Sequence, residues 1–159
     1  MFRNLCFVIA LTTLPVSAQT PEKSAVLATV QAFFDSMQNK DAAVAGRVLI
    51  RDGQFHSIRE QDGRPQIRTQ THQQFLDGLA AMPAVLERMW DPTVLIEGPL
   101  AVVWTSYDFH REGEFSHCGV DAFTLLKTPA GWKITGASYT VIRDNCTESP
   151  LGPPGGNAP

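Results

Sequence analysis

The sequence predicts an α+β fold in which three N-terminal helices pack on one face of a strongly curved, mostly antiparallel sheet. Helical spacing of apolar residues dominates the first part of the chain, and long β-type segments dominate the part after residue 84. Turn signals such as Glu112-Gly113 separate those β-type segments. Helices followed by a run of strands indicate an α+β plan with the helices gathered on one side of the sheet.

Three segments have the patterns of helices. The first spans residues 21–40, where one stripe of apolar residues faces the core: Val26, Leu27, Val30, Phe33, Phe34 and Met37. The second spans residues 41–50, with Asp41 as its N-cap. The third spans roughly residues 72–81, with Thr71 as its cap and an end near Pro83.

The remaining elements are strands. A hairpin is expected between residues 54 and 71, because Asp62-Gly63 is a favoured tight-turn pair. Four longer segments then alternate with turn signals and form an antiparallel meander: residues 85–96, 100–111, 114–127 and 132–143.

The two ends of the chain differ from this domain. Residues 1–18 combine Arg3, an apolar run over residues 5–14 and small residues up to Ala18, which is typical of a cleaved signal peptide. The alternative is a retained N-terminal anchor. The domain is predicted over residues 19–143, in an exported protein that is periplasmic or secreted. Residues 144–159 are rich in Pro and Gly and are predicted to be a mostly disordered tail.

Charge and motif patterns exclude several functions. The chain has 13 Lys and Arg against 16 Asp and Glu, a formal net charge of -3, without a basic stripe, so nucleic acid is not expected as a partner. No second apolar segment is long enough to cross a membrane once the signal is removed. No metal-ligand spacing such as C-x-x-C occurs, so neither a metal nor a cofactor is predicted.

The stretch FSHCGVDAF, residues 115–123, places reactive side chains in an otherwise apolar strand. Successive side chains in a strand point to opposite faces, so His117 and Cys118 diverge, whereas His117 and Asp121 share a face about 13 Å apart at about 3.3 Å per residue. With two-residue pairing around Glu112-Gly113, His117 is expected opposite Asp108. Asp121 is then expected opposite Trp104 on one side and Ser138 on the other.

This register predicts a pocket with a polar end. The ligand-binding residues expected there, together with His56 of the hairpin at the mouth, are His56, Trp104, Asp108, His117, Asp121 and Ser138. His117 with Asp108 or Asp121 is the catalytic set if the protein is an enzyme, since a carboxylate beside an imidazole makes a general base. A purely structural cross-strand pair is the alternative. The opposite, apolar face, which includes Tyr107 and Val141, is a candidate homodimer surface.

Two cysteines remain after signal removal. Cys118 faces away from the predicted pocket, and Cys146 follows Asp144-Asn145, which permit a sharp turn. An even cysteine count in an oxidising compartment favours a Cys118–Cys146 disulfide. A buried free thiol and a nucleophile are the alternatives.

The helix-led order, with FSHCGVDAF and GWKI in its strands, resembles the nuclear transport factor 2-like superfamily over residues 22–146. Within it, the chain is similar to the SnoaL-like group and to a bacterial group named for lumazine binding. The resemblance implies a cone-shaped fold with a pocket for a small organic molecule of unknown identity. It also implies three classes of function: binding without chemistry, acid–base catalysis of isomerase, dehydratase or cyclase type, and a non-catalytic subunit that binds a partner protein.

Overall fold

The computed structural model describes residues 21–155; residues 1–20, which include the predicted signal peptide, and residues 156–159 lie outside the described part. The described elements, in chain order, are α1 (Pro21–Asn39), α2 (Ala42–Val48), β1 (Leu49–Gln61), β2 (Arg64–Thr71), α3 (His72–Gly78), the 3₁₀ turn η1 (Leu79–Ala81), β3 (Val85–Glu97), β4 (Leu100–Arg111), β5 (Glu114–Thr128) and β6 (Gly131–Val141).

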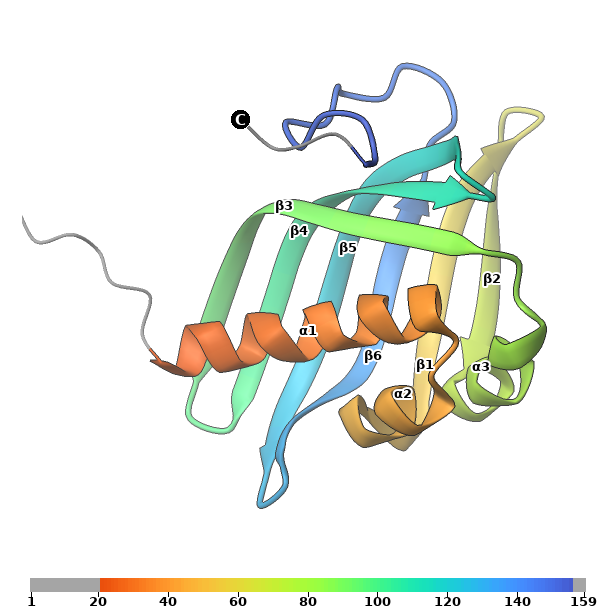
Figure 1. The fold of residues 1–159 in the computed structure, drawn as a ribbon. Helices are drawn as coiled ribbons and strands as arrows, with labels where there is room; N and C mark the ends of the chain where they lie inside the picture. The colour runs from red at the N-terminus through yellow and green to blue at the C-terminus, as the bar shows by residue number, and fades with distance from the viewer. Residues whose placement is uncertain (1–20, 156–159) are drawn as a thin grey trace, which may run out of the picture.

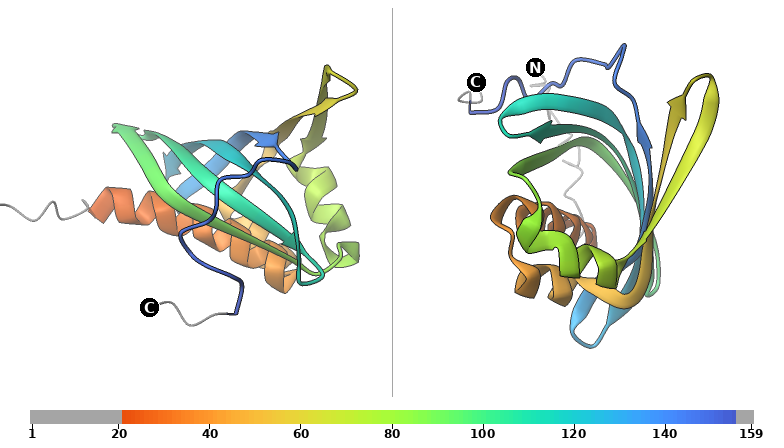
Figure 2. Two further views of the ribbon diagram at one scale, coloured as in Figure 1. Left: turned by 90° about the horizontal axis from the view of Figure 1, so that it is seen from above. Right: turned by 90° about the vertical axis from the view of Figure 1, so that its right-hand side faces the viewer.

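The six strands form one curved sheet in the order β2-β1-β6-β5-β4-β3. All neighbouring pairs are antiparallel except β1 with β6, which is parallel. The sheet bends around the helices, which all lie on its concave side (Figures 1 and 2). The predicted fold class is therefore confirmed.

Local sequence explains where the helices begin. The Asp41 carboxylate accepts hydrogen bonds from the N–H groups of Ala43 and Val44 and so caps α2. At α3, the Thr71 side chain accepts a hydrogen bond from the Gln74 N–H, and the Gln74 side chain accepts one from the Thr71 N–H. This reciprocal capping box satisfies two of the helix's otherwise unpaired donors.

Helix α1 supplies one wall of the core. Its buried stripe includes Val26, Val30, Phe33 and Phe34, as the apolar spacing predicts. The Phe33 ring lies 5.2 Å from Phe55 of β1, centroid to centroid. Aromatic rings at this separation stabilise beyond their area burial, by about 0.5–1.5 kcal/mol per pair. The core on the concave side of the sheet therefore contains a cluster of aromatic rings among its aliphatic residues.

Two β-bulges shift the strand register away from the predicted one. Arg111 pairs with Glu114 as expected, but Ser116 is an extra residue, so His117 pairs with Phe109 and not with Asp108. Thr135 is a second extra residue, so Asp121 pairs with Tyr139 and not with Ser138. Because side chains alternate with a period of two, each one-residue shift exchanges the faces of the strand beyond it.

The exchange also changes which residues lie on the outer face. Tyr107, which was expected there, points into the concave side and lines a pocket together with Tyr139. The outer face instead exposes four large apolar residues of β3, β4 and β5: Leu95, Leu100, Trp104 and Leu126.

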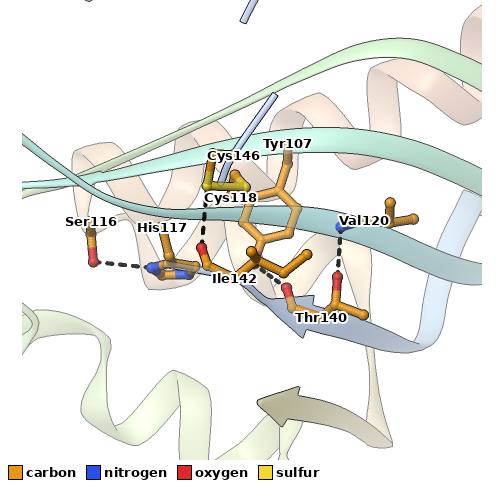
Figure 3. The surroundings of a disulfide bond; sticks show 8 residues. All are labelled: Tyr107, Ser116, His117, Cys118, Val120, Thr140, Ile142 and Cys146. Atoms are coloured by element: carbon orange, nitrogen blue, oxygen red, sulfur yellow. Dashed lines mark hydrogen bonds between the residues drawn. A yellow bond between two sulfur atoms is a disulfide. The ribbon is translucent and has the colours of Figure 1, made fainter. Parts of the chain in front are cut away.

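The predicted disulfide is present. Cys118 of β5 is bonded to Cys146, 28 residues later, with a Cα–Cα distance of 5.9 Å (Figure 3). Cys118 and Ile142 also exchange two backbone hydrogen bonds of 2.9 Å, which extend β6 by one bridge. The chain then returns over the outer face (Figure 2), where the Ser149 side chain is hydrogen-bonded to Asp108 of β4. Residues 144–155 contain no helix or strand.

Among the described residues, no helix has both the length and the apolar character needed to span a membrane.

Candidate functional site

A cavity of about 290 Å³ lies between the helices and the concave face of the sheet. Its apolar walls include five phenylalanines: Phe33, Phe55, Phe75, Phe109 and Phe123. Its polar groups come from five different strands: Gln70, Glu87, Tyr107, His117, Asp121 and Tyr139. Gln70 and Gly78, which are exposed, lie at the mouth. At about 30 Å³ per water molecule, the space corresponds to about ten waters, and it suits a small organic ligand.

The carboxyl groups of Glu87 and Asp121 are hydrogen-bonded to each other in this cavity. Two carboxyl groups can share a hydrogen bond only when at least one of them carries a proton. Burial raises the pKa of Asp121 to about 8. Burial and the nearby Asp121 carboxylate also raise the pKa of Glu87 well above its ordinary value. The pair therefore retains at least one proton at neutral pH.

Asp121 has unused hydrogen-bonding capacity. Its side chain belongs to a residue that is only 2% exposed. Its Oδ2 atom is buried and has no hydrogen-bond partner among the described residues. A buried polar atom without a partner is costly, so such atoms in native structures call for an explanation. Asp121 lines the cavity beside Glu87, so the carboxyl pair borders the space that a bound molecule would fill.

His117 lines the same cavity in its neutral form. Its ring stacks on Phe109 with centroids 4.7 Å apart, and its Nδ1 lies 3.0 Å from the Ser116 hydroxyl. Burial, with a smaller effect of the Arg143 charge, lowers the pKa of His117 to about 4. At neutral pH this imidazole can therefore accept or donate a hydrogen bond but carries no charge.

The two tyrosines differ in how they are held. The Tyr107 hydroxyl donates a 2.7 Å hydrogen bond to the Thr140 carbonyl (Figure 3). Tyr139 is hydrogen-bonded to Ser57, and burial raises the pKa of both phenols. Both tyrosines therefore stay protonated near neutral pH. Tyr107 contributes its ring rather than a free hydroxyl to the cavity.

Asp108 lies outside the cavity, on the convex side of the sheet. It pairs with Cys118 in the ladder, and Arg88 donates two hydrogen bonds to it, of 2.8 Å from Nε and 2.6 Å from Nη2. The His110 Nε2 atom lies 3.3 Å from the same carboxylate. The predicted His117–Asp108 dyad is therefore wrong: the bulge at Ser116 places the two side chains on opposite faces.

Three other predicted ligand-binding residues also lie outside the cavity. Trp104 is 58% exposed on the convex face. Ser138 is exposed there, and His56 lies 3.0 Å from the Thr69 hydroxyl across the β1–β2 hairpin. His56 and Ser138 line a shallow depression of that outer face instead. Of the six predicted residues, the structure brings together only His117 and Asp121 in the cavity.

Glu87 is the residue that sequence reasoning missed. It shares a strand face with Val85 and Met89, which contact the core, so an acid at this position is exceptional. The alternation of Val85, Glu87 and Met89 was the available signal. The sequence did not show that Asp121 is the partner of Glu87. The two residues lie on β5 and β3, which are separated by β4, and their side chains meet on the concave face.

A larger, open groove of about 990 Å³ lies between the β1–β2 hairpin and the segment after β6. Its lining shares no residue with the concave cavity. Within residues 21–155 no cluster of three or more His, Cys, Asp or Glu side chains has a metal-binding arrangement.

The fold is shared with solved structures of the nuclear transport factor 2-like superfamily. One from Salmonella enterica matches with a TM-score of 0.62 and 13% identity over 83% of this chain and 99% of that chain. One from Cytophaga hutchinsonii matches with a TM-score of 0.64 and 16% identity over 77% and 100%. A Streptomyces avermitilis protein described as a candidate dehydratase of that family matches with a TM-score of 0.58 and 16% identity over 75% and 94%.

These likenesses establish an α+β protein with a nuclear transport factor 2-like fold, as the sequence resemblance predicted. No family model matches the chain, and no curated protein matches its sequence. The narrower SnoaL-like and lumazine-binding groupings therefore remain predictions.

Proposed function

We propose that this protein binds a small organic molecule in the concave cavity. The observation that carries the proposal is the hydrogen-bonded carboxyl pair of Glu87 and Asp121 in the lining of an aromatic cavity of about 290 Å³. Such a cavity combines apolar walls, which give affinity, with a few polar groups, which orient the ligand.

The proposal is tested by filling the cavity. Ala137 is buried and lines it, whereas its neighbour Ser138 is exposed on the other face. Small molecules carried through native purification are identified by mass spectrometry for the wild type, Ala137→Phe and the control Ser138→Phe. We expect a molecule with the wild type and with Ser138→Phe, and loss of that molecule with Ala137→Phe. Equal retention by all three proteins would place the ligand elsewhere. A wild type that carries no molecule, and that no member of a ligand library stabilises thermally, would refute binding.

Acid–base catalysis of isomerase, dehydratase or cyclase type is the second candidate. It is favoured by the Glu87–Asp121 pair, because a carboxyl group whose pKa is raised toward neutrality can both give and take a proton. Asp121 and His117 are the proposed catalytic residues, and Asp108 is not among them. Turnover of an identified substrate should show a bell-shaped pH profile and be abolished in Asp121→Asn. Unchanged turnover in that variant would exclude the role of Asp121.

We also propose export to an oxidising compartment. The Cys118–Cys146 disulfide is consistent with it, since structural disulfides are rare in the cytosol. The predicted signal peptide supports the same location. Fractionation of cells that produce the full-length chain, with N-terminal sequencing of the product, tests both points. A product that starts at residue 1 in the cytosol would contradict the proposal.

A further inference from the structure

The charged side chains in the lining of the cavity are of one sign. Two carboxyl groups, Glu87 and Asp121, belong to its lining, and none of the described lining residues is a lysine or an arginine. His117 is neutral near pH 7, because burial lowers its pKa to about 4. A ligand carboxylate or phosphate would therefore meet only negative or neutral groups.

The walls suit a positive charge. Five phenylalanines and two tyrosines line the cavity, and their ring faces carry partial negative charge. A cation over such a face is attracted by the ring, most strongly where water is excluded. Aromatic walls next to acidic groups are the usual arrangement for recognising ammonium groups in proteins.

A nearby cation would stabilise the ionised forms of the two acids. Burial disfavours ionisation of both acids, and the Asp121 carboxylate and, from the other face of the sheet, the Asp108 carboxylate add to this effect at Glu87. In the ligand-free protein a shared proton compensates the repulsion. The Oδ2 atom of Asp121 still has no donor. An ammonium group in the cavity would supply the positive charge that the pair lacks.

We propose that the cavity binds a small organic cation, a protonated amine or a quaternary ammonium compound, with its charge against Glu87 and Asp121 and its carbon atoms against the aromatic rings. This inference rests on the proposed function that the cavity binds a small molecule. Binding displaces a proton from the carboxyl pair to solvent. Affinity for the cation therefore rises with pH until the pair is ionised.

Other titratable or charged groups act on the pair or on its neighbours and limit the pH range of a test. They are Tyr107 and Asp108 on β4, His117 on β5, Tyr139 on β6, Arg68 on β2, which acts on Tyr139, and Arg143 after β6, which acts on His117. The pKa of His117 lies near 4 and the pKa of both tyrosines is raised, so none of these groups changes charge between about pH 6 and pH 8.5.

The test compares three aromatic probes of similar size by isothermal titration calorimetry on the disulfide-bonded protein: benzyltrimethylammonium, benzyl alcohol and benzoate. We expect benzyltrimethylammonium to bind most tightly, with affinity rising by up to about tenfold per pH unit below pH 8. Titration in buffers of different ionisation enthalpy should show release of a proton. Glu87→Gln should weaken cation binding by about tenfold, which corresponds to ~1.4 kcal/mol, and should weaken it more than it changes benzyl alcohol binding. Glu114→Gln, an exposed acid on β5, is the matched control.

Each outcome decides a different claim. Binding of benzyl alcohol without binding of the cation would overturn the cation inference and leave the small-molecule proposal in place. Tight binding of benzoate would do the same. Cation binding that Glu87→Gln and Glu114→Gln weaken equally would reflect general surface charge and overturn the inference. Failure of all three probes would count against both the inference and the proposed function.

Discussion

Asp108 and Asp121 are buried aspartates on neighbouring strands, 3% and 2% exposed, yet their ionisation is opposite. For Asp108, burial alone would raise the pKa, but hydrogen bonds from Arg88 and Ser149 and the charges of Arg88 and His110 outweigh it and lower the pKa. Asp121 has a carboxyl group as its neighbour, and burial raises its pKa to about 8.

The difference distinguishes an aspartate with a structural role from one that lines the candidate site. Asp108, on the convex face, is satisfied by a fork of two hydrogen bonds from Arg88 and covered by the C-terminal segment. Asp108 and Arg88 therefore form a structural ion pair. Asp121, on the concave face, keeps a buried oxygen without a partner beside a cavity. Both residues are inaccessible to solvent, but only Asp108 has cationic partners that outweigh the effect of burial on its pKa.

The largest expected effect is on the ion pair. Arg88→Met should lower the free energy of unfolding at pH 7 by about 3–5 kcal/mol, because it leaves the Asp108 carboxylate buried without its partner. Asp121→Asn should cost less than about 1 kcal/mol, since the amide can still hydrogen-bond to Glu87. Urea unfolding of the two variants measures both values. Equal losses would contradict the distinction between the two aspartates.

The disulfide is next in size. Replacing Cys118 and Cys146 with alanine should lower the free energy of unfolding by about 3–4 kcal/mol, from the chain entropy of a loop of this length. The change should also free the segment that holds Ser149 against Asp108, and thereby raise the pKa of Asp108 toward its ordinary value. Urea unfolding and carboxyl titration by NMR measure the two effects. Two free thiols in protein purified from an oxidising compartment would contradict the disulfide itself.

The pH dependence of stability separates the two aspartates further. Because the pKa of Asp121 is raised in the folded state, its contribution is fully present below about pH 4 and is lost as pH rises to about 8. Asp108, whose pKa is lowered, loses its contribution only as pH falls below the ordinary value of 3.8. We therefore measure the free energy of unfolding of the wild type and of Asp121→Asn and take the wild-type value minus the variant value. This difference should fall between pH 4 and pH 8 by an amount on the order of a few kcal/mol, since one pKa unit corresponds to ~1.4 kcal/mol. A flat difference would show that Asp121 titrates normally.

The smallest effect is expected at Trp104, on the convex face. Trp104→Ser should change the free energy of unfolding by less than about 0.5 kcal/mol, since the side chain is 58% exposed. We propose that the apolar residues around Trp104 mediate self-association, in which case the variant lowers the mass measured by analytical ultracentrifugation. The same mass for both proteins would exclude a dimer through this patch.

The local features of the chain were predictable because short-range rules produce them. The capping by Asp41 and Thr71 and the Asp62-Gly63 turn follow from neighbouring residues. The opposite orientations of His117 and Cys118 follow from strand geometry on a single segment. The disulfide was predictable for the same reason, since few residues separate the end of β6 from Cys146.

What the sequence by itself determined, then, is the order of elements, the fold class and which residues of one strand share a face. The tertiary structure alone decided which residues of different strands meet. The extra residues Ser116 and Thr135 moved Asp108, Trp104 and Ser138 to the convex side, and the curvature of the sheet brought Glu87 to Asp121. A bulge arises where the bending of the whole sheet demands it, and no local pattern in either strand specified its position.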